Sequence, residues 1–333
     1  MRAEDLLHPT PAGLYCPVGD FYVDPSRPVP RALVTHGHSD HARPGHGAVW
    51  ATRETLDVMA IRLGEGFAET TQDGSAGEIG GVKVSFHPAG HILGSAQIRL
   101  EWRGLRIVVS GDYKRSRDPT APPFEPLPCD VFVTEATFAL PVFRHPEPTE
   151  EIARLLASLR AFPERAHLVG AYSLGKAQRV IALLREAGWD RPIFLHGALR
   201  RLCDYYAARG VDLGPLEDAT GDRAEAARTA GEIIVAPPSA FGSAWERRFP
   251  APLQAFASGW MQVRAHARRR GAELGLVISD HVDWPALTDT IREVDPGEVW
   301  ITHGREDALL RWCDLEGRAA RPLHLVGREE EAE

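Results

Sequence analysis

The chain has 333 residues, of which 44% are hydrophobic and 25% charged, and its formal net charge is -8 at pH 7. This composition is typical of an ordinary soluble globular protein, and the length predicts two domains that each have a core. The negative charge argues against a protein that coats nucleic acid non-specifically, so any phosphate binding must come from local basic clusters.

The four cysteines are scattered and form no C-x-x-C pair. Their spacing predicts a reducing compartment and argues against a disulfide framework or a structural zinc knuckle. The N-terminus leads into no sustained apolar segment, and no run reaches the length of a membrane span. We therefore expect a cytoplasmic protein that does not bind membranes. The acidic stretch at 329–333 is expected to be disordered and solvated.

The first predicted element is a β-hairpin arm from Leu14 to Asp24. Asp24 closes this arm just before the next strand, where its carboxylate could orient an imidazole that binds a metal. A simple turn residue ahead of Pro25 is the alternative interpretation of Asp24. Both interpretations stay open at this point.

A short apolar run then predicts a buried strand that leads into the motif T-H-G-H-S-D-H at 35–41. His36 and His38 are two residues apart, so they point to one side while strand geometry lasts. Asp40 and His41 must turn toward a second position. Neutral imidazole and carboxylate are the ligands that Zn²⁺ or Mn²⁺ prefers, and the spacing predicts two metals.

Three later strands end in residues of the same kind. His91 lies between glycines after a strand predicted at 82–86. Asp112 follows a hairpin whose second arm ends at Ser110, and Glu135 closes another buried strand. A carboxylate at position 112 can bridge two metals, because each oxygen can bind one cation. Such side chains gathered at strand ends are typical of a hydrolase site.

Two basic groups are candidates for binding substrate phosphate. Lys114, Arg115 and Arg117 come directly after Asp112, and this compact positive group could hold a phosphodiester. A solvated basic turn is the alternative interpretation. Lys176 lies in a loop before a predicted helix, where exposed N–H groups and a lysine can bind a phosphate. This loop lacks the full P-loop spacing, so nucleotide binding as in an ATPase is not expected.

The middle of the chain alternates between helices and strands. The predicted elements here are helices at 150–159, 178–186 and 199–208 and strands at 167–170, 192–195 and 233–235. This alternation predicts a small parallel α/β domain inserted between two halves of the first domain. We expect the first half at 1–145, the insert at 146–255 and the completing half at 256–333.

The pattern of the first domain returns near Ala255. Four arginines and one histidine at 264–270 form the densest basic cluster of the sequence. A strand predicted at 276–281 ends on a histidine, His281. Another apolar strand ends on His303.

The strand-end residues provide enough ligands for two metals that share a water. Such a pair lowers the pKa of the water and stabilises the attacking and leaving oxygens of an in-line displacement. The expected metal ligands are His36, His38, Asp40, His41, His91, Asp112 and His303. His281 and Glu135 remain, and an imidazole steadied by a carboxylate can act as a general acid. The other histidines are expected to be surface or packing residues: His8, His46, His87, His145, His167, His196, His266 and His324.

These residues resemble a known family. The motif at 36–41, followed by His91 and Asp112, resembles the H-x-H-x-D-H, His and Asp motifs of the metallo-β-lactamase fold. Motifs A, B and C of the β-CASP branch, whose members cut nucleic acids, are similar to Thr134–Phe138, Ser279–His281 and Thr302–Gly304. The resemblance implies a mixed α/β protein, an αββα metallo-β-lactamase sandwich with an inserted β-CASP α/β domain.

Within that branch, three stretches look like the bacterial ligase-associated DNA-repair exonucleases, which often carry the label mRNA 3′-end processing factor. These stretches are residues 236–240, 257–261 and 278–285. The resemblance implies an exonuclease that degrades DNA in a repair context, with a weak preference for 5′ to 3′ digestion. It also implies a functional association with an ATP-dependent DNA ligase and a helicase.

The resemblance assigns a role to each site residue. One divalent metal, Zn²⁺ or Mn²⁺, would be held by His36, His38 and His91, the other by Asp40, His41 and His303, with Asp112 bridging. Asp40, His281 and Glu135 are expected to be catalytic: His281 would protonate the leaving 3′ oxygen, and Glu135 would orient it.

Three other functions stay open. In eukaryotic members motif C is valine in enzymes that cut DNA, such as Artemis, and histidine in those that cut RNA, so His303 favours an RNA-cleaving enzyme. A small-molecule hydrolase of the lactamase or glyoxalase kind would explain the metals but not the insert or motifs A to C. A non-catalytic nucleic-acid-binding subunit would usually have lost metal ligands, and none is missing from the sequence.

Overall fold

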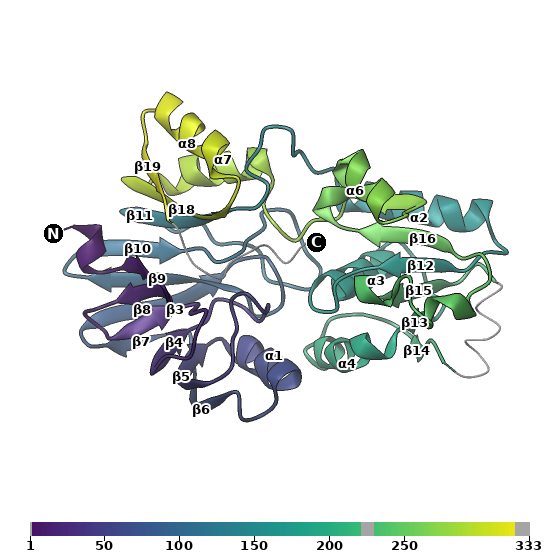
Figure 1. Cartoon of the computed structure of the whole chain (residues 1–333), viewed down its shortest axis with the longest axis horizontal. Helices are drawn as coiled ribbons and strands as arrows, with labels where there is room; N and C mark the ends of the chain where they lie inside the picture. Colours follow the sequence, from purple (N-terminus) through teal and green to yellow (C-terminus); the bar gives the residue numbers. More distant parts are fainter. Residues whose placement is uncertain (1, 221–229, 324–333) are drawn as a thin grey trace. The chain divides into compact units, whose positions relative to one another are not determined.

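The computed structural model describes residues 2–220 and 230–323 (Figure 1), so the acidic stretch at 329–333 lies outside the described part of the chain. The chain divides into two compact units. Unit 1 comprises Met1–Arg144 and His281–Glu333, and unit 2 comprises His145–Asp280. Of the helices within the described ranges, none has both the length and the apolar character that crossing a membrane requires.

Unit 1 contains two sheets. The first has six strands in sequence order, antiparallel from β1 to β3 and parallel from β3 to β6. Its strands are β1 (His8–Thr10), β2 (Gly13–Cys16), β3 (Phe21–Val23), β4 (Arg31–Leu33), β5 (His46–Ala51) and β6 (Ala68–Asp73). A one-turn 3-10 helix, η1 (Ala3–Asp5), precedes this sheet.

The second sheet of unit 1 has seven strands in the order β19-β18-β11-β10-β9-β8-β7. The neighbours from β7 to β10 pair antiparallel, and those from β10 to β19 pair parallel. Its strands are β7 (Ala76–Ile79), β8 (Val82–Pro88), β9 (Ala96–Trp102), β10 (Leu105–Val109), β11 (Val131–Ala136), β18 (Glu298–Gly304) and β19 (Ala319–Pro322). The parallel strands β11 and β18 bring the second part of unit 1 back beside the first.

Three apolar clusters hold these layers together. One combines side chains of both sheets, such as Phe21 and Leu33 from the first and Ile98 and Trp300 from the second. Another joins the opposite face of the second sheet to helices α7 (Trp284–Val294) and α8 (Glu306–Leu315). The third joins the first sheet to α1 (Arg53–Leu63). Alternate residues of each strand face opposite sides, so each sheet contributes to two clusters.

Local sequence explains where the helices of unit 1 begin. Thr52 precedes α1, and its side chain accepts a hydrogen bond from the Thr55 amide. Asp283 does the same for α7 by accepting from the Ala286 amide, and Pro285 stands in the first turn, where no amide donor is needed. These caps satisfy amides that have no partner inside the helix.

Unit 2 is a single parallel sheet with helices. Its strand order is β14-β13-β15-β12-β16-β17, and every pair in it is parallel. The strands are β12 (His167–Gly170), β13 (Ile193–Leu195), β14 (Leu216–Asp218), β15 (Ile233–Ala236), β16 (Leu253–Ala257) and β17 (Leu274–Leu276). The helices are α2 (Pro148–Ala161), α3 (Lys176–Glu186), α4 (Arg200–Ala208) and α6 (Arg264–Arg269), with 3-10 turns η2 (Gly197–Leu199), η3 (Pro238–Ala240), η4 (Glu246–Arg248) and η5 (Gly259–Gln262). The mixed α/β class and a small parallel α/β unit in mid-chain are as predicted.

The second border between the units differs from the sequence-based one. The boundary expected at 255/256 falls inside β16, which pairs with β12 and β17, and the compact unit continues to Asp280. The strand expected at 276–281 is also displaced, because β17 covers Leu274–Leu276 and ends where the expected strand begins. Beyond it, the Val277 amide donates to the Glu151 side chain instead of to a strand.

Candidate metal centre

The motif at 35–41 lies on a loop. Strand β4 ends at Leu33, and the chain then turns, with the Ala42 amide donating to the His38 carbonyl at 2.7 Å. The expectation that strand geometry aligns His36 with His38 is therefore wrong, and their rings are perpendicular, with centroids 5.0 Å apart. The turn carries Asp40 and His41 toward a second position, as expected.

Asp112 is the centre of the site. It follows β10 and is 3% exposed. Its Oδ2 lies 3.4 Å from His36 Nε2 and 3.7 Å from His91 Nε2. Its Oδ1 lies 3.4 Å from His41 Nε2 and 3.2 Å from His303 Nε2. The two oxygens of one carboxylate thus face two different pairs of imidazoles.

The remaining predicted ligands join these two groups. His38 Nδ1 lies 3.0 Å from His91 Nε2, and His36, His38, His91 and Asp112 form one set whose ligand atoms lie within 4.8 Å of one another. His41, Asp112 and His303 form another such set, and Asp40 Oδ2 lies 3.2 Å from His41 Nε2. The structure therefore places all seven predicted ligands close together, with Asp112 common to both sets. Their binding of two metals, in the grouping that the family resemblance implies, stays a prediction.

Several ligand atoms are buried without a hydrogen-bond partner. Within the described residues, His36 Nε2, His41 Nε2 and Asp112 Oδ1 have none. An unpaired buried polar atom is costly, and such an atom marks a place where an ion or water belongs. Imidazole nitrogens that converge with carboxylate oxygens are the donor set of Zn²⁺ and Mn²⁺ sites, so these residues fit two divalent metals.

Two threonines fix the imidazoles so that Nε2 faces the site. The Thr35 hydroxyl donates to Asp24 Oδ2 at 2.7 Å and lies 3.1 Å from His36 Nδ1. The Thr302 hydroxyl donates to the Thr134 carbonyl and lies 3.1 Å from His303 Nδ1. Because each hydroxyl already donates elsewhere, it accepts from the neighbouring Nδ1–H and leaves the Nε2 lone pair for a metal. The orienting role of these threonines was not predicted, although each directly precedes a predicted ligand histidine in the sequence.

Asp24 orients the third imidazole. Its Oδ2 lies 2.8 Å from His41 Nδ1, and its Oδ1 accepts from the Thr35 amide at 2.7 Å. The carboxylate is buried, with 1% exposure. Of the two interpretations of Asp24 from the sequence, the structure supports the orienting carboxylate.

Around the first ligand set, the electrostatics favour neutral imidazoles at His36 and His91 beside an ionised Asp112. Burial, followed by the charge of His41, lowers the pKa of His36 to about 4. Burial and the neighbouring His36 and His38 also hold the pKa of His91 well below its usual value. Burial alone would raise the pKa of Asp112, but His41 and His281 outweigh it and keep that pKa well below normal.

The second position carries more negative charge. Burial opposes ionisation of Asp40, but His41 lowers the pKa of this carboxyl well below its ordinary range. Burial also opposes protonation of His41, yet Asp40, Asp112 and Asp24 together raise its pKa well above normal. A concentration of carboxylates around one imidazole is suited to a divalent cation, because the cation offsets their charge.

His281 and Glu135 form a pair at the edge of this cluster. His281 Nδ1 lies 2.9 Å from Glu135 Oε2, and the Tyr113 amide donates to Glu135 Oε1 at 2.7 Å. Both oxygens of the carboxylate are therefore fixed. The His281 side chain is 13% exposed, so it retains access to solvent, and its Nδ1 lies 4.0 Å from Asp112 Oδ2. A carboxylate-steadied imidazole at the mouth of a metal cluster can deliver a proton.

A glycine allows the central loop to approach the histidine motif. Gly111 has φ +57°, and a Cβ there would lie 2.8 Å from both Cβ and Oγ1 of Thr35. A larger residue would strain the backbone and displace Thr35 or Asp112. The spacing of Ser110-Gly111-Asp112 thus positions both Asp112 and the threonine that orients His36.

The predicted phosphate-binding residues are engaged inside the protein. Lys114 is 2% exposed and pairs with Asp118, and Lys176 in unit 2 is 1% exposed and pairs with Asp280 at 3.3 Å. Arg115 contacts Glu293 at 2.7 Å and is 28% exposed. In this structure the three basic residues therefore form ion pairs with carboxylates of the protein. Their binding of phosphate stays a prediction.

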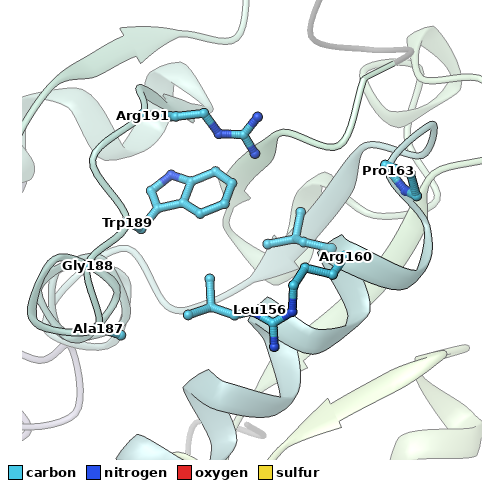
Figure 2. Close-up of a pocket in the computed structure, with 8 residues that line it drawn as sticks. Leu156, Arg160, Pro163, Ala187, Gly188, Trp189 and Arg191 are labelled. Atoms are coloured by element: carbon cyan, nitrogen blue, oxygen red, sulfur yellow. The ribbon is translucent and has the colours of Figure 1, made fainter.

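A pocket of about 400 Å³ lies within unit 2 (Figure 2). Figure 2 shows Arg191 beside Trp189, whose ring centroid lies 4.2 Å from the guanidinium carbon, and Leu156 with Arg160 on another wall. The lining holds no histidine, cysteine or carboxylate. It therefore offers no metal ligand and no acid or base.

We expect Asp24→Ala to weaken metal binding about 10- to 100-fold, because the variant leaves His41 without the carboxylate that fixes its tautomer and ring. Metal affinity is measured by competition with a chelator of known affinity. Asp20→Ala is the control, because it removes an exposed carboxylate that accepts from the Tyr15 hydroxyl in the turn before β3. Equal metal affinities in the two variants would show that Asp24 is a simple turn residue and does not orient His41.

Comparison with known proteins extends these observations. No family model matches the chain. It is 29% identical over 303 residues to a protein of Opitutus terrae named probable DNA ligase, a match that covers 88% of this chain and 28% of that protein. It is 31% identical over 144 residues to the endoribonuclease ysh1 of Emericella nidulans, covering 41% of this chain and 15% of that protein. It is 26% identical over 222 residues to the endoribonuclease YSH1 of Mycosarcoma maydis, covering 51% and 24%.

A solved structure shares the fold. It is a protein of unknown function from Enterococcus faecalis V583, with a TM-score of 0.55 and 12% identity, and the match covers 83% of this chain and 76% of that chain. The curated relatives are much longer than the match: the chain spans 28%, 15% and 24% of their lengths.

The histidine–carboxylate cluster contains groups of side chains that could hold metal ions. The similarity to proteins named probable DNA ligase and endoribonuclease YSH1 agrees with the resemblance to β-CASP nucleases seen in the sequence motifs.

Proposed function

We propose that the chain is a two-metal phosphodiesterase that cleaves nucleic acid. The observation that carries this proposal is the geometry of Asp112, whose two oxygens face two separate pairs of imidazoles at 3.2 to 3.7 Å. A single metal would leave one of these oxygens and its imidazoles without a partner. The proposal gives every buried ligand atom of the cluster a role.

In this proposal His36, His38, His91 and Asp112 hold one metal, and Asp40, His41, His303 and Asp112 hold the other. Two divalent metals, Zn²⁺ or Mn²⁺, would lower the pKa of a water and offset the charge of a phosphodiester. The chain contributes oriented ligands: Asp24, Thr35 and Thr302 fix the rings so that Nε2 points into the site. Such fixed rings reduce the reorganisation that metal binding would otherwise require.

His281 would provide the proton for the leaving oxygen. Its Nδ1 is held by Glu135, so Nε2 is the nitrogen available to a substrate. Glu135 acts on the reaction through His281 and is a positioning residue. Protonation of an alkoxide leaving group by a positioned imidazole contributes about 10²- to 10⁴-fold to a rate.

Within this function we propose exonucleolytic digestion of DNA in a repair context. The support is the match along 88% of the chain to a protein named as a DNA ligase. An association with an ATP-dependent ligase belongs to the same proposal, and a helicase partner stays a prediction from the family resemblance. RNA cleavage is the second candidate, because His303 stands at motif C and the shorter matches are to proteins named endoribonucleases.

We propose further that unit 1 is the αββα metallo-β-lactamase domain and unit 2 the β-CASP insert. The three apolar clusters of unit 1 support a helix–sheet–sheet–helix order, and the parallel sheet of unit 2 lies between the two halves of unit 1 in sequence. Cytoplasmic location stays a prediction from the cysteine pattern.

The test uses DNA and RNA single strands of matched sequence, labelled at either end, with Mn²⁺ or Zn²⁺. Mononucleotides or short products released progressively from DNA alone would support the DNA exonuclease, and the labelled end that disappears first gives the polarity. Preferential cutting of RNA would contradict the DNA exonuclease and support an RNA-processing enzyme. Failure to cleave either strand, combined with turnover of a thioester or β-lactam, would contradict the nuclease and favour a small-molecule hydrolase.

A further inference from the structure

Unit 2 carries a basic surface that the chemistry of the metal centre does not use. It consists of α6 (Arg264–Arg269) and the following Arg270, and we call these residues the α6 basic patch. Arg264, Arg268 and Arg269 are exposed. Among the residues that the structure describes, none forms an ion pair with these three arginines.

Three other arginines of the same unit are neutralised by neighbours. Arg165 contacts Glu273 at 2.7 Å, Arg200 contacts Asp218 at 2.7 Å, and Arg191 contacts Glu232 at 3.3 Å. Glu273 is the first acid that follows the patch in the sequence, and its partner is Arg165. Arg264, Arg268 and Arg269 therefore concentrate positive charge on one exposed part of unit 2.

One histidine, His266, lies within the patch. Burial, followed by the charges of Arg269 and Arg270, lowers the pKa of His266. The imidazole of His266 stacks on Trp260 with centroids 5.3 Å apart and planes 27° apart. An aromatic pair thus lies beside the arginines, and Trp260 is only partly buried.

The patch also has a defined place in the sheet of unit 2. Trp260 lies in η5, directly after the carboxyl end of β16, and α6 connects β16 to its parallel neighbour β17. Ligands of open parallel sheets bind outside the carboxyl ends of the strands. Within unit 2, the chain leaves the carboxyl end of β17 toward Asp280, the residue before His281.

We propose that the α6 basic patch and Trp260 bind the sugar–phosphate backbone of a single nucleic-acid strand and so hold the substrate to unit 2. This inference rests on the proposed function and adds the surface that would retain a long substrate. Exposed arginines beside a partly exposed aromatic are the features that bind single strands without sequence preference. The overall charge of -8 makes such a local cluster necessary for any polyanion to bind.

The test compares Arg268→Glu/Arg269→Glu with Arg247→Glu/Arg248→Glu in the holoenzyme. The second pair is an exposed arginine pair of the same unit outside the patch, so both variants change the net charge equally. Three quantities are measured: the affinity for a phosphorothioate oligonucleotide, the dependence of this affinity on salt, and kcat/KM for bis(p-nitrophenyl) phosphate.

The patch variant should bind the oligonucleotide about ten-fold more weakly than the control variant, with a salt slope shallower by about 1.4, since each lost phosphate contact removes about 0.7. Hydrolysis of the small phosphodiester should be unchanged in both variants, because it does not need the patch. Equal loss of affinity in both variants would mean that only the net charge matters, and this would overturn the inference. Unchanged affinity in the patch variant would also overturn it. Absence of small-phosphodiester hydrolysis in the wild type would contradict the proposed function instead, and the affinity comparison would still decide on the patch.

Discussion

Asp112→Asn is expected to remove metal binding and activity together. The amide keeps the shape of the carboxylate but lacks its charge, so the four imidazole nitrogens at 3.2 to 3.7 Å no longer share an anion. Both proposed metal positions would depend on this residue, because Asp112 belongs to both proposed ligand sets and also to a third group with Glu135 and His281. We expect fewer than two metal ions per chain after dialysis and a rate at least about a thousandfold lower, which corresponds to about 4 kcal/mol of transition-state stabilisation.

Asp130→Asn is the matched control for this change. Asp130 lies directly before β11 in the same unit. It pairs with Arg106 at 3.4 Å and belongs to no ligand set among the described residues. Metal content by mass spectrometry and the melting temperature are measured on both variants. If Asp112→Asn retained two metals and normal turnover, the bridging role of this carboxylate would be refuted.

His281→Ala is expected to retain both metals but to lose most of its rate on nucleic acid. The lost proton donor matters most for an alkoxide, which is a poor leaving group, so kcat on an oligonucleotide should fall about 10²- to 10⁴-fold. Hydrolysis of bis(p-nitrophenyl) phosphate should change little, because p-nitrophenolate leaves without a proton. This contrast between leaving groups separates a general acid from a residue that merely supports the fold.

Two further variants sharpen the His281 result. His87→Ala removes another histidine that lies beside a glutamate, 3.3 Å from Glu125, and should leave both substrates unaffected. Glu135→Gln preserves an acceptor for the Tyr113 amide but removes the charge that steadies His281, so its loss should fall between those of the wild type and His281→Ala. A loss of equal size on both substrates in His281→Ala would rule out the acid role.

Much of the site could be predicted from the sequence because its ligands occupy strand ends and a dense local motif. Asp112 follows the apolar strand β10, and Glu135 lies near the end of the apolar strand β11. Residue type and spacing were sufficient there, since parallel neighbouring strands bring their ends together. Long-range contacts could not be predicted in this way. The orienting roles of Thr35 and Thr302 depend on which distant carboxylate or carbonyl accepts a hydrogen bond from each hydroxyl.

The fold was predicted best where hydrophobic patterns were strong. Strand β12 has the expected bounds, His167–Gly170. Strand β6 was missed, because Ala68–Asp73 is polar and largely exposed and has no apolar alternation to reveal it. The border between the units was misplaced because membership of β16 in the second sheet depends on its pairing with β12, which the local sequence does not encode.

The most direct test of the two-metal phosphodiesterase titrates metal back into chelator-treated protein while hydrolysis of bis(p-nitrophenyl) phosphate is followed. The account predicts no hydrolysis without metal and a rate that saturates at about two Mn²⁺ or Zn²⁺ ions per chain. Full activity in the metal-free protein, or saturation at a single ion, would contradict it.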